Sequence, residues 1–355
     1  MLMTVNPTLH FQAGNLSSLP LRVSKEEELP GIVSECVAIS EEDWSLRETA
    51  WSHRASPLIL DSAMPALLSD RWKEWSRDRD VARARLHELE VANNMIWIRE
   101  FALEGVVSES VDIEEAALTR PSREADIAAL ISYAVGCMFG RYSLDESGLV
   151  LADQGATLQD YLAKVPMPTF MPDADNVIPI VDGDWFEDDI VERFRQFMRA
   201  AFGEQHLGEN LQFVTQSLGV KNLRDYFVKS FYKDHIQRYK KRPIYWLFSS
   251  PKGSFNALIY MHRYTPSTVS TVLTYLREYV TKLESALQQA ERAGNAKEAD
   301  RLRKILVELN EYEHDTLFPK ASENVVLDID DGVKANYPKF GAALKKIPGL
   351  EAASD

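Results

Sequence analysis

The fold is indicated most clearly by residues 267–316, which read STVSTVLTYLREYVTKLESALQQAERAGNAKEADRLRKILVELNEYEHDT. Apolar side chains recur there at alternating steps of four and three residues, a pattern typical of a helix that packs along one seam against another helix. The first run consists of Val269, Leu273, Leu276, Val280, Leu283, Leu287 and Ala290, and the second of Leu302, Ile305, Leu309 and Tyr312. Ala293-Gly294-Asn295 interrupts the pattern between the two runs. Two helices joined by such a short turn form an antiparallel hairpin, which we predict over residues 267–318.

The residues before this hairpin predict a small pair of strands. Residues 244–248 and 257–261 are rich in aromatic and branched apolar side chains, which strands favour. The segment between them contains Pro251 and Gly253, two residues typical of turns. We therefore expect a β insertion at this point of the chain.

Most of the remaining sequence predicts helices. A long helix is expected from Trp72 to about Leu103, and a second one, rich in small residues, over 123–140. Gly136 and Gly140 are four residues apart on one face of the second helix, which favours close packing against another element. The expected fold class is mainly α with a small β insertion (α+β), built as a helical-bundle body with an antiparallel helical hairpin near the C-terminus.

Composition divides the chain into consecutive segments. Residues 145–185 are rich in Gly, Pro and Asp, which predicts a long irregular connection. The expected segments are a helical domain over 26–150, an irregular connector over 151–185, a basic and aromatic-rich helical and β region over 186–266, the hairpin over 267–318 and a C-terminal segment over 319–355.

The overall composition fits a folded cytoplasmic protein. The 355 residues are 45% hydrophobic and carry a net charge of −14, which excludes a wholly disordered chain. Cys36 and Cys137 form neither a CxxC pair nor a zinc-ligand spacing, so we expect two reduced thiols. The sequence shows no apolar run of membrane-spanning length and no signal peptide. The expected localisation is the cytoplasm, without a membrane partner.

Sequence signatures of several reactions are missing. None of the 16 glycines is two residues from another, so the Gly-x-Gly turn common in S-adenosylmethionine sites is absent. The Asn/Asp-Pro-Pro-Tyr/Phe loop of amino methyltransferases is also absent, since Asn6-Pro7 is followed by Thr8. No Asp/Glu-x-Lys step of metal-dependent nucleases and no HExxH motif occurs. We therefore predict no catalytic, cofactor-binding or metal-binding residue in this chain.

Positive charge is concentrated in residues 221–264. This stretch holds ten bases and two acids, a net charge of +8, while the rest of the chain carries −22. It also holds eleven aromatic residues. Clustered cations displace counterions from phosphates, so we expect part of the stretch to contact double-stranded DNA. The candidate DNA-binding residues are Lys233, Arg238, Lys240, Lys241, Arg242, Lys252, Asn256 and Arg263.

Within this set, Lys252 and Asn256 are side chains of a type that reads base edges. The alternative is that many of the aromatic side chains belong to the core and that the lysines are only a solvated face.

Several stretches, in order along the chain, resemble one family. They are NPTLHFQAGN at 6–15, GCMFGRYSLD at 136–145, ENL at 209–211, KRPIYWLFSS at 241–250, ALIYMHRY at 257–264, DIDDGVK at 328–334 and NYP at 336–338. Together they resemble the C-terminal region of PglX-type adenine-specific DNA methyltransferases of bacterial BREX phage-defence systems. The stretch at 241–250 is the most specific of these matches.

The resemblance implies a role in site-specific methylation of adenine N6, with S-adenosylmethionine as cofactor of the intact enzyme. It implies that residues 1–25 end a target-recognition region and that this chain supplies DNA recognition and scaffolding. An upstream methyltransferase half or other BREX proteins would be its partners, and the chain alone is predicted to be inactive. The alternative function is a protein-interaction module that docks other components of the defence system.

Overall fold

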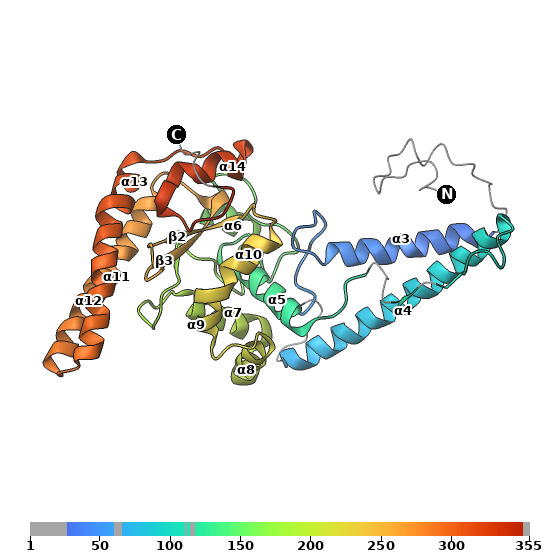
Figure 1. Cartoon of the computed structure of the whole chain (residues 1–355), viewed down its shortest axis with the longest axis horizontal. Helices are drawn as coiled ribbons and strands as arrows, with labels where there is room; N and C mark the ends of the chain where they lie inside the picture. Colours follow the sequence, from blue (N-terminus) through green and yellow to red (C-terminus); the bar gives the residue numbers. More distant parts are fainter. Residues whose placement is uncertain (1–26, 60–65, 111, 114–117, 351–355) are drawn as a thin grey trace. The chain divides into compact units, whose positions relative to one another are not determined.

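The computed structural model describes residues 27–59, 66–110, 112–113 and 118–350. These residues are mainly helical and include one small antiparallel sheet, which confirms the predicted fold class (Figure 1). Contacts divide the chain into two compact units, the first formed within Met1–Trp44 and Ser76–Pro121 and the second within Ser45–Trp75 and Ser122–Asp355. The segment boundaries proposed from composition stay predictions.

The first unit is built on two helices, α3 (Leu29–Ser45) and most of α4 (Leu68–Glu100). The buried Arg79 guanidinium lies 3.0 Å from the carboxylate of Asp43, and Arg85 lies 2.7 Å from Glu35. The later residue of α3, Asp43, faces the earlier residue of α4, Arg79, and the order is reversed for Glu35 and Arg85. The helices α3 and α4 therefore run antiparallel. Asp43 also accepts hydrogen bonds from Thr119, which ties the segment after α4 to the pair.

The centre of the second unit is α5 (Arg123–Met138), in which every residue from Leu130 to Met138 is buried. A Cβ atom placed on Gly136 would lie 2.4 Å from the ring of Tyr142, and one on Gly140 would lie 3.1 Å from Leu151. Both glycines therefore allow close packing, but α5 ends before Gly140, which has φ +75°, so the two glycines do not share a helix face as expected. Helix α5 contacts α7 (Ile190–Phe202) and α8 (Leu207–Ser217).

Three short strands form the sheet in the order β1-β3-β2, with both pairs antiparallel. The strands are β1 (Ile178–Pro179), β2 (Tyr245–Ser249) and β3 (Asn256–Tyr260). All of their residues are buried, so both faces of the sheet are covered. The pair β2–β3 matches the strands predicted from composition, whereas the two-residue β1 lies in a segment where no strand was predicted.

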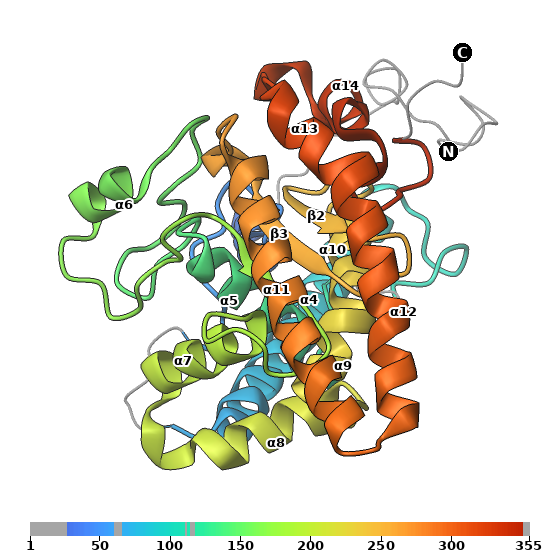
Figure 2. The same ribbon diagram turned by 90° about the vertical axis from the view of Figure 1, so that its left-hand side faces the viewer.

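The hairpin is formed by α11 (Thr268–Arg292) and α12 (Ala296–Tyr312), which pack side by side in both views (Figures 1 and 2). Gly294 has φ +68°, and the Asn295 side chain caps α12 by accepting from the Glu298 N–H. Seam residues such as Leu276 and Leu309 are fully buried. The heptad pattern therefore does position this element correctly.

The other elements are short. They are α6 (Leu158–Lys164), η2 (Glu204–His206), α9 (Leu223–Tyr226), η3 (Phe227–Phe231), α10 (Tyr232–Arg238), η4 (Met261–Arg263), η5 (Glu313–Leu317), α13 (Phe318–Glu323), η6 (Ile329–Asp331), α14 (Val333–Asn336) and η7 (Tyr337–Ala343). Of these, η3 and η5 are π-helical turns that continue α9 into α10 and α12 into α13. In the described part of the chain, no helix combines the length and the apolar character that a membrane span requires.

Candidate nucleic-acid interface

The basic stretch 221–264 runs from the α9–α10 segment through β2 and β3 to η4. Ten of its eleven aromatic side chains are buried in the core. The other, Tyr239, is partly buried and donates a hydrogen bond of 2.8 Å to Glu48. These rings hold the fold together, so none of them offers an exposed face for base stacking.

Two of the predicted DNA-binding residues lie inside the fold. Arg263 is buried and donates to the carbonyls of Asp173 at 2.8 Å and Ala174 at 3.1 Å. Asn256 is also buried, and its amide donates to the carbonyls of Ile180 and Gly253. Because their donors are used within the fold, these two side chains are not presented at the surface as the other predicted contacts are.

Other cations of the stretch are compensated by nearby carboxylates. The Arg224 guanidinium lies between Asp184 at 2.5 Å and the buried Asp189 at 2.6 Å, and Lys229 pairs with Asp225 at 2.7 Å. Asp184 and Asp189 lie outside residues 221–264 and reduce the positive charge that the linear count, which already includes Asp225, assigns to the region. The stretch is therefore less basic at its surface than its sequence indicates.

Arg238 is a partly exposed cation in a mixed environment. It lines a cleft of about 450 Å³ together with Glu124 and Asp234. Lys233, on the same helix α10, is exposed. Lys233 is therefore the more accessible of the two predicted contacts on this helix.

The longest run of consecutive exposed residues in the basic stretch is the turn after α10, where Lys240, Lys241 and Arg242 all face solvent. We call these three residues the turn cluster. Lys240 and Lys241 have φ angles of +49° and +61°, in the left-handed region that side chains rarely adopt. Each such residue costs roughly 1–3 kcal/mol, so the surrounding contacts must hold this backbone in place.

Those contacts are backbone and histidine hydrogen bonds. The N–H of Lys241 donates to the Ile236 carbonyl at 2.8 Å. The Nε2 atom of the buried His235 accepts from the N–H groups of Ile244 and Tyr245, at 3.2 and 3.1 Å. Burial, with the charges of Arg238 and Arg141, lowers the pKa of His235 to about 3, so the ring is neutral and able to accept. The turn cluster is thus displayed by a fixed loop.

Lys252 lies apart from the turn cluster. It is exposed in the turn between β2 and β3, whereas the turn cluster precedes β2. The length of β2 alone separates the two positions by about 13 Å along the strand. The structure therefore divides the linear basic stretch into two separate surfaces.

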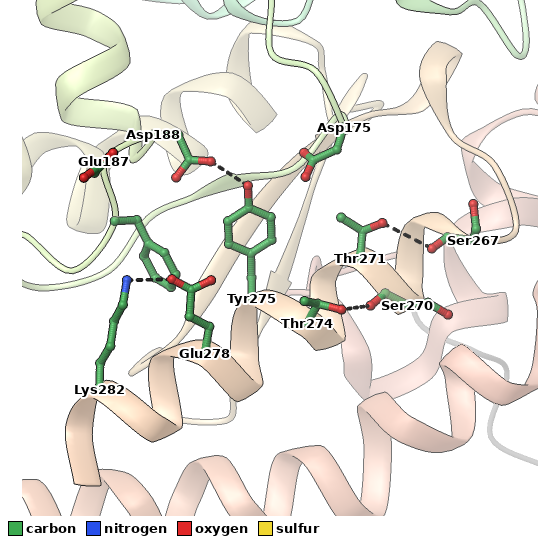
Figure 3. Close-up of a pocket in the computed structure, with 11 residues that line it drawn as sticks. Asp175, Glu187, Asp188, Ser267, Ser270, Thr271, Thr274, Tyr275, Glu278 and Lys282 are labelled. Carbon is green, nitrogen blue, oxygen red and sulfur yellow. Dashed lines mark hydrogen bonds and ion pairs between the residues drawn. The ribbon is translucent and has the colours of Figure 1, made fainter. Parts of the chain in front are cut away.

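The acidic residues around 173–189 form a different surface. Asp175, Asp188 and Glu278 line a cleft of about 790 Å³ beside α11 (Figure 3). Tyr275 donates to Asp188 at 2.5 Å, and Lys282 pairs with Glu278 at 2.6 Å. We call this the acidic cleft; its carboxylates oppose the approach of phosphate.

The most perturbed carboxylate of this region lies behind the acidic cleft. Burial, together with the neighbouring Asp175 carboxylate, raises the pKa of Asp173 to about 7. The backbone carbonyl of Asp173 is the acceptor for Arg263, and the two residues stabilise each other within the core. Among the described residues, no group of three or more His, Cys, Asp or Glu side chains is placed to hold a metal ion.

The chain was compared with known protein families and with individual known proteins. No known family profile matches it. It is 34% identical to the adenine-specific methyltransferase BrxX of Escherichia coli O9:H4 (strain HS), over 97% of this chain and 31% of that protein. It is 32% identical to the adenine-specific methyltransferase PglX of Lacticaseibacillus casei (strain Zhang), over 98% of this chain and 30% of that protein. The chain is thus a relative of the PglX-type adenine-specific methyltransferases and spans about a third of their length.

Proposed function

We propose that this chain corresponds to the C-terminal part of a BREX-type, site-specific N6-adenine DNA methyltransferase, where it serves DNA recognition and scaffolding. The observation that carries the proposal is the match of nearly the whole chain to two adenine-specific methyltransferases. The chain itself contains neither a Gly-x-Gly turn nor an Asn/Asp-Pro-Pro loop. Binding of S-adenosylmethionine and methyl transfer to a flipped adenine would then belong to other parts of such an enzyme.

The turn cluster is the proposed DNA contact. Its three cations are exposed on a fixed loop, and Lys233 on α10 adds a fourth exposed cation of the same stretch. Neutralising phosphates releases condensed counterions, which favours binding at low salt. The net charge of −14 over the whole chain keeps other surfaces from binding DNA indiscriminately.

The test is a titration of the full chain with duplex DNA at several salt concentrations. A turn variant, Lys240→Gln/Lys241→Gln/Arg242→Gln, is compared with a control variant, Lys73→Gln/Lys320→Gln/Lys334→Gln, which loses the same charge from other elements. If all three cations meet phosphates, the log–log salt slope of the turn variant is shallower by about 2.7, at about 0.9 per contact. The control variant should keep the slope of the wild type.

Two outcomes would count against the proposal. A wild-type chain without salt-dependent DNA binding would favour the alternative, a module that docks other BREX proteins. Equal slopes for the turn and control variants would remove the turn cluster from the interface.

A further inference from the structure

Helix α12 lies outside the basic stretch 221–264 and carries a row of cations of its own. Lys297, Arg301 and Lys304 are separated by four and three residues, which places them on one side of the helix. All three are exposed. Together with Lys252 of the β2–β3 turn they line a cleft of about 500 Å³, which we call the hairpin cleft.

The charges in the hairpin cleft do not cancel. Arg301 binds Glu298 through two hydrogen bonds of 2.9 and 2.7 Å. Asp300, the exposed acid of the cleft, is held by Arg303 at 2.6 Å. In the part of the chain that the structure describes, Lys252, Lys297 and Lys304 form no ion pair. Three lysines are therefore available for an external anion.

The remaining carboxylate of the hairpin cleft, Glu308, is used by the fold. It is buried and accepts from the Ser250 hydroxyl at 2.6 Å, the Lys252 N–H at 2.7 Å and the Ser254 hydroxyl. Burial raises its pKa, but these hydroxyl and backbone donors outweigh burial and bring the pKa below its ordinary value. Glu308 thus fastens the β2–β3 turn to α12 and keeps Lys252 beside the row of cations.

The size of the row identifies the kind of anion. At 1.5 Å per residue, Lys297 and Lys304 are about 10 Å apart along the axis of α12, and Glu308, which binds the Lys252 backbone, is about 6 Å further. The row of cations therefore extends over roughly 16 Å, while phosphates of one DNA strand advance by about 3.4 Å along the duplex axis. This length corresponds to nearly five such steps, so the row spans several successive phosphates of a strand, whereas a mononucleotide would reach only part of the row.

From this geometry we propose that the hairpin cleft binds the phosphate backbone of duplex DNA, as a contact separate from the turn cluster. The inference rests on the proposed function, since it names a second DNA surface of the same module. The positive end of the α12 dipole lies beside Lys297, which adds to the attraction for phosphate. The carboxylates of the acidic cleft repel a polyanion from the α11 side of the hairpin, whereas the lysines of the hairpin cleft attract it to the α12 side.

The inference is tested with a cleft variant of the full chain, Lys252→Gln/Lys297→Gln/Lys304→Gln, alongside the turn and control variants. The lysines are exposed and form no ion pairs in the described structure, so the cleft variant should fold normally, as checked by circular dichroism and thermal unfolding. Losing three phosphate contacts makes the salt slope shallower by about 2.7 and weakens binding on the order of 500-fold at 0.1 M salt. A charge-retaining variant, with arginine at the same three positions, should bind like the wild type.

The outcomes separate this inference from the proposed function. If the wild type binds DNA and the cleft variant keeps the slope of the control variant, the hairpin cleft is not a DNA contact, and the proposed function stands. If the turn and cleft variants each lose part of the slope, the duplex contacts both surfaces. If the wild type shows no salt-dependent binding, both the proposed function and the inference are overturned.

Discussion

Replacing Glu308 by alanine tests how the β2–β3 turn is attached to α12. The substitution removes the acceptor of three hydrogen bonds, from the Ser250 hydroxyl, the Lys252 N–H and the Ser254 hydroxyl. Ser250 is buried, with 1% of its surface exposed, so its hydroxyl donor would be left without an acceptor. Ser254 is only partly buried and can bond to water instead.

The magnitude follows from these environments. An unsatisfied buried donor costs about 1–3 kcal/mol, and each of the two more exposed hydrogen bonds contributes about 0.5–1.5 kcal/mol. Removing a buried charge offsets part of this loss. We expect the Glu308→Ala variant to lose about 2–4 kcal/mol of local stability in the turn.

Hydrogen exchange at the Lys252 amide measures this loss directly, because Glu308 is its acceptor. At about 1.4 kcal/mol per tenfold change, exchange should become roughly 30- to 700-fold faster. Glu311→Ala, which removes an exposed carboxylate from the same helix, is the matched control and should leave the amide protected. An unchanged exchange rate in Glu308→Ala would refute the role given to this carboxylate.

The same substitution has a predicted pH dependence. The folded pKa of Glu308 lies below its ordinary value of 4.5, so its stabilisation is present above about pH 4.5 and is lost as the pH falls through the folded pKa. The difference in exchange between wild type and Glu308→Ala should therefore shrink in acid. A difference that persists unchanged at low pH would show that the ionised carboxylate is not responsible.

Three further predictions concern the core of the second unit. Gly136→Ala should lower the free energy of unfolding by about 1–3 kcal/mol, because the added Cβ atom meets the Tyr142 ring. Gly208→Ala adds a Cβ atom in open space and should raise the free energy of unfolding by up to about 1 kcal/mol. Urea unfolding measures both variants. Arg263→Met should lower this free energy by about 2–4 kcal/mol, through its lost carbonyl contacts, yet leave the salt slope of DNA binding unchanged; urea unfolding and the DNA titration decide. His235 has a folded pKa of about 3, so below pH 6.5 the unfolded chain binds a proton that the folded protein does not, and the free energy of unfolding should fall by about 1.4 kcal/mol per pH unit. Urea unfolding at pH 7 and pH 5 should show a smaller loss for the His235→Gln variant than for the wild type.

Each of these predictions can fail clearly. Equal stabilities of the two glycine variants would contradict the close contact at Gly136. A shallower salt slope in Arg263→Met would restore this residue as a DNA contact. Parallel pH dependences of the wild type and His235→Gln would show that another group is responsible.

The elements that were predictable from the sequence are those specified by local patterns. The heptad steps of 267–316 are a property of one helix surface, and they identify the hairpin before any partner is known. The small side chains at Gly136 and Gly140 indicate tight contacts, but the sequence does not show that α5 ends before Gly140 or that Tyr142 and Leu151 make these contacts. Strand β1 was not foreseen because two residues carry no periodic signal and owe their conformation to β3.

The candidate site was only partly predictable, since exposure depends on residues distant in the chain. Arg263 is of the right chemical type, but the carbonyls of Asp173 and Ala174 enclose it. Counting charge along the chain finds Lys252 and overlooks Lys297, because residues around 297 include their own acids. The signal in the sequence is the spacing of Lys297, Arg301 and Lys304, which places them on one face of a helix. Counting charge on each helix face, and not along each segment, would have found it.

The acidic cleft and the hairpin cleft give the hairpin an electric dipole across its width. A field from a nearby polyanion exerts a torque on such a dipole and turns the α12 side toward the polyanion. Charges are screened beyond about 8 Å at physiological ionic strength, so this alignment operates only in the last stage of an encounter. The hairpin would then select the orientation of approach, in addition to any contribution to affinity, and neutralising the carboxylates beside α11 would allow unproductive orientations to persist.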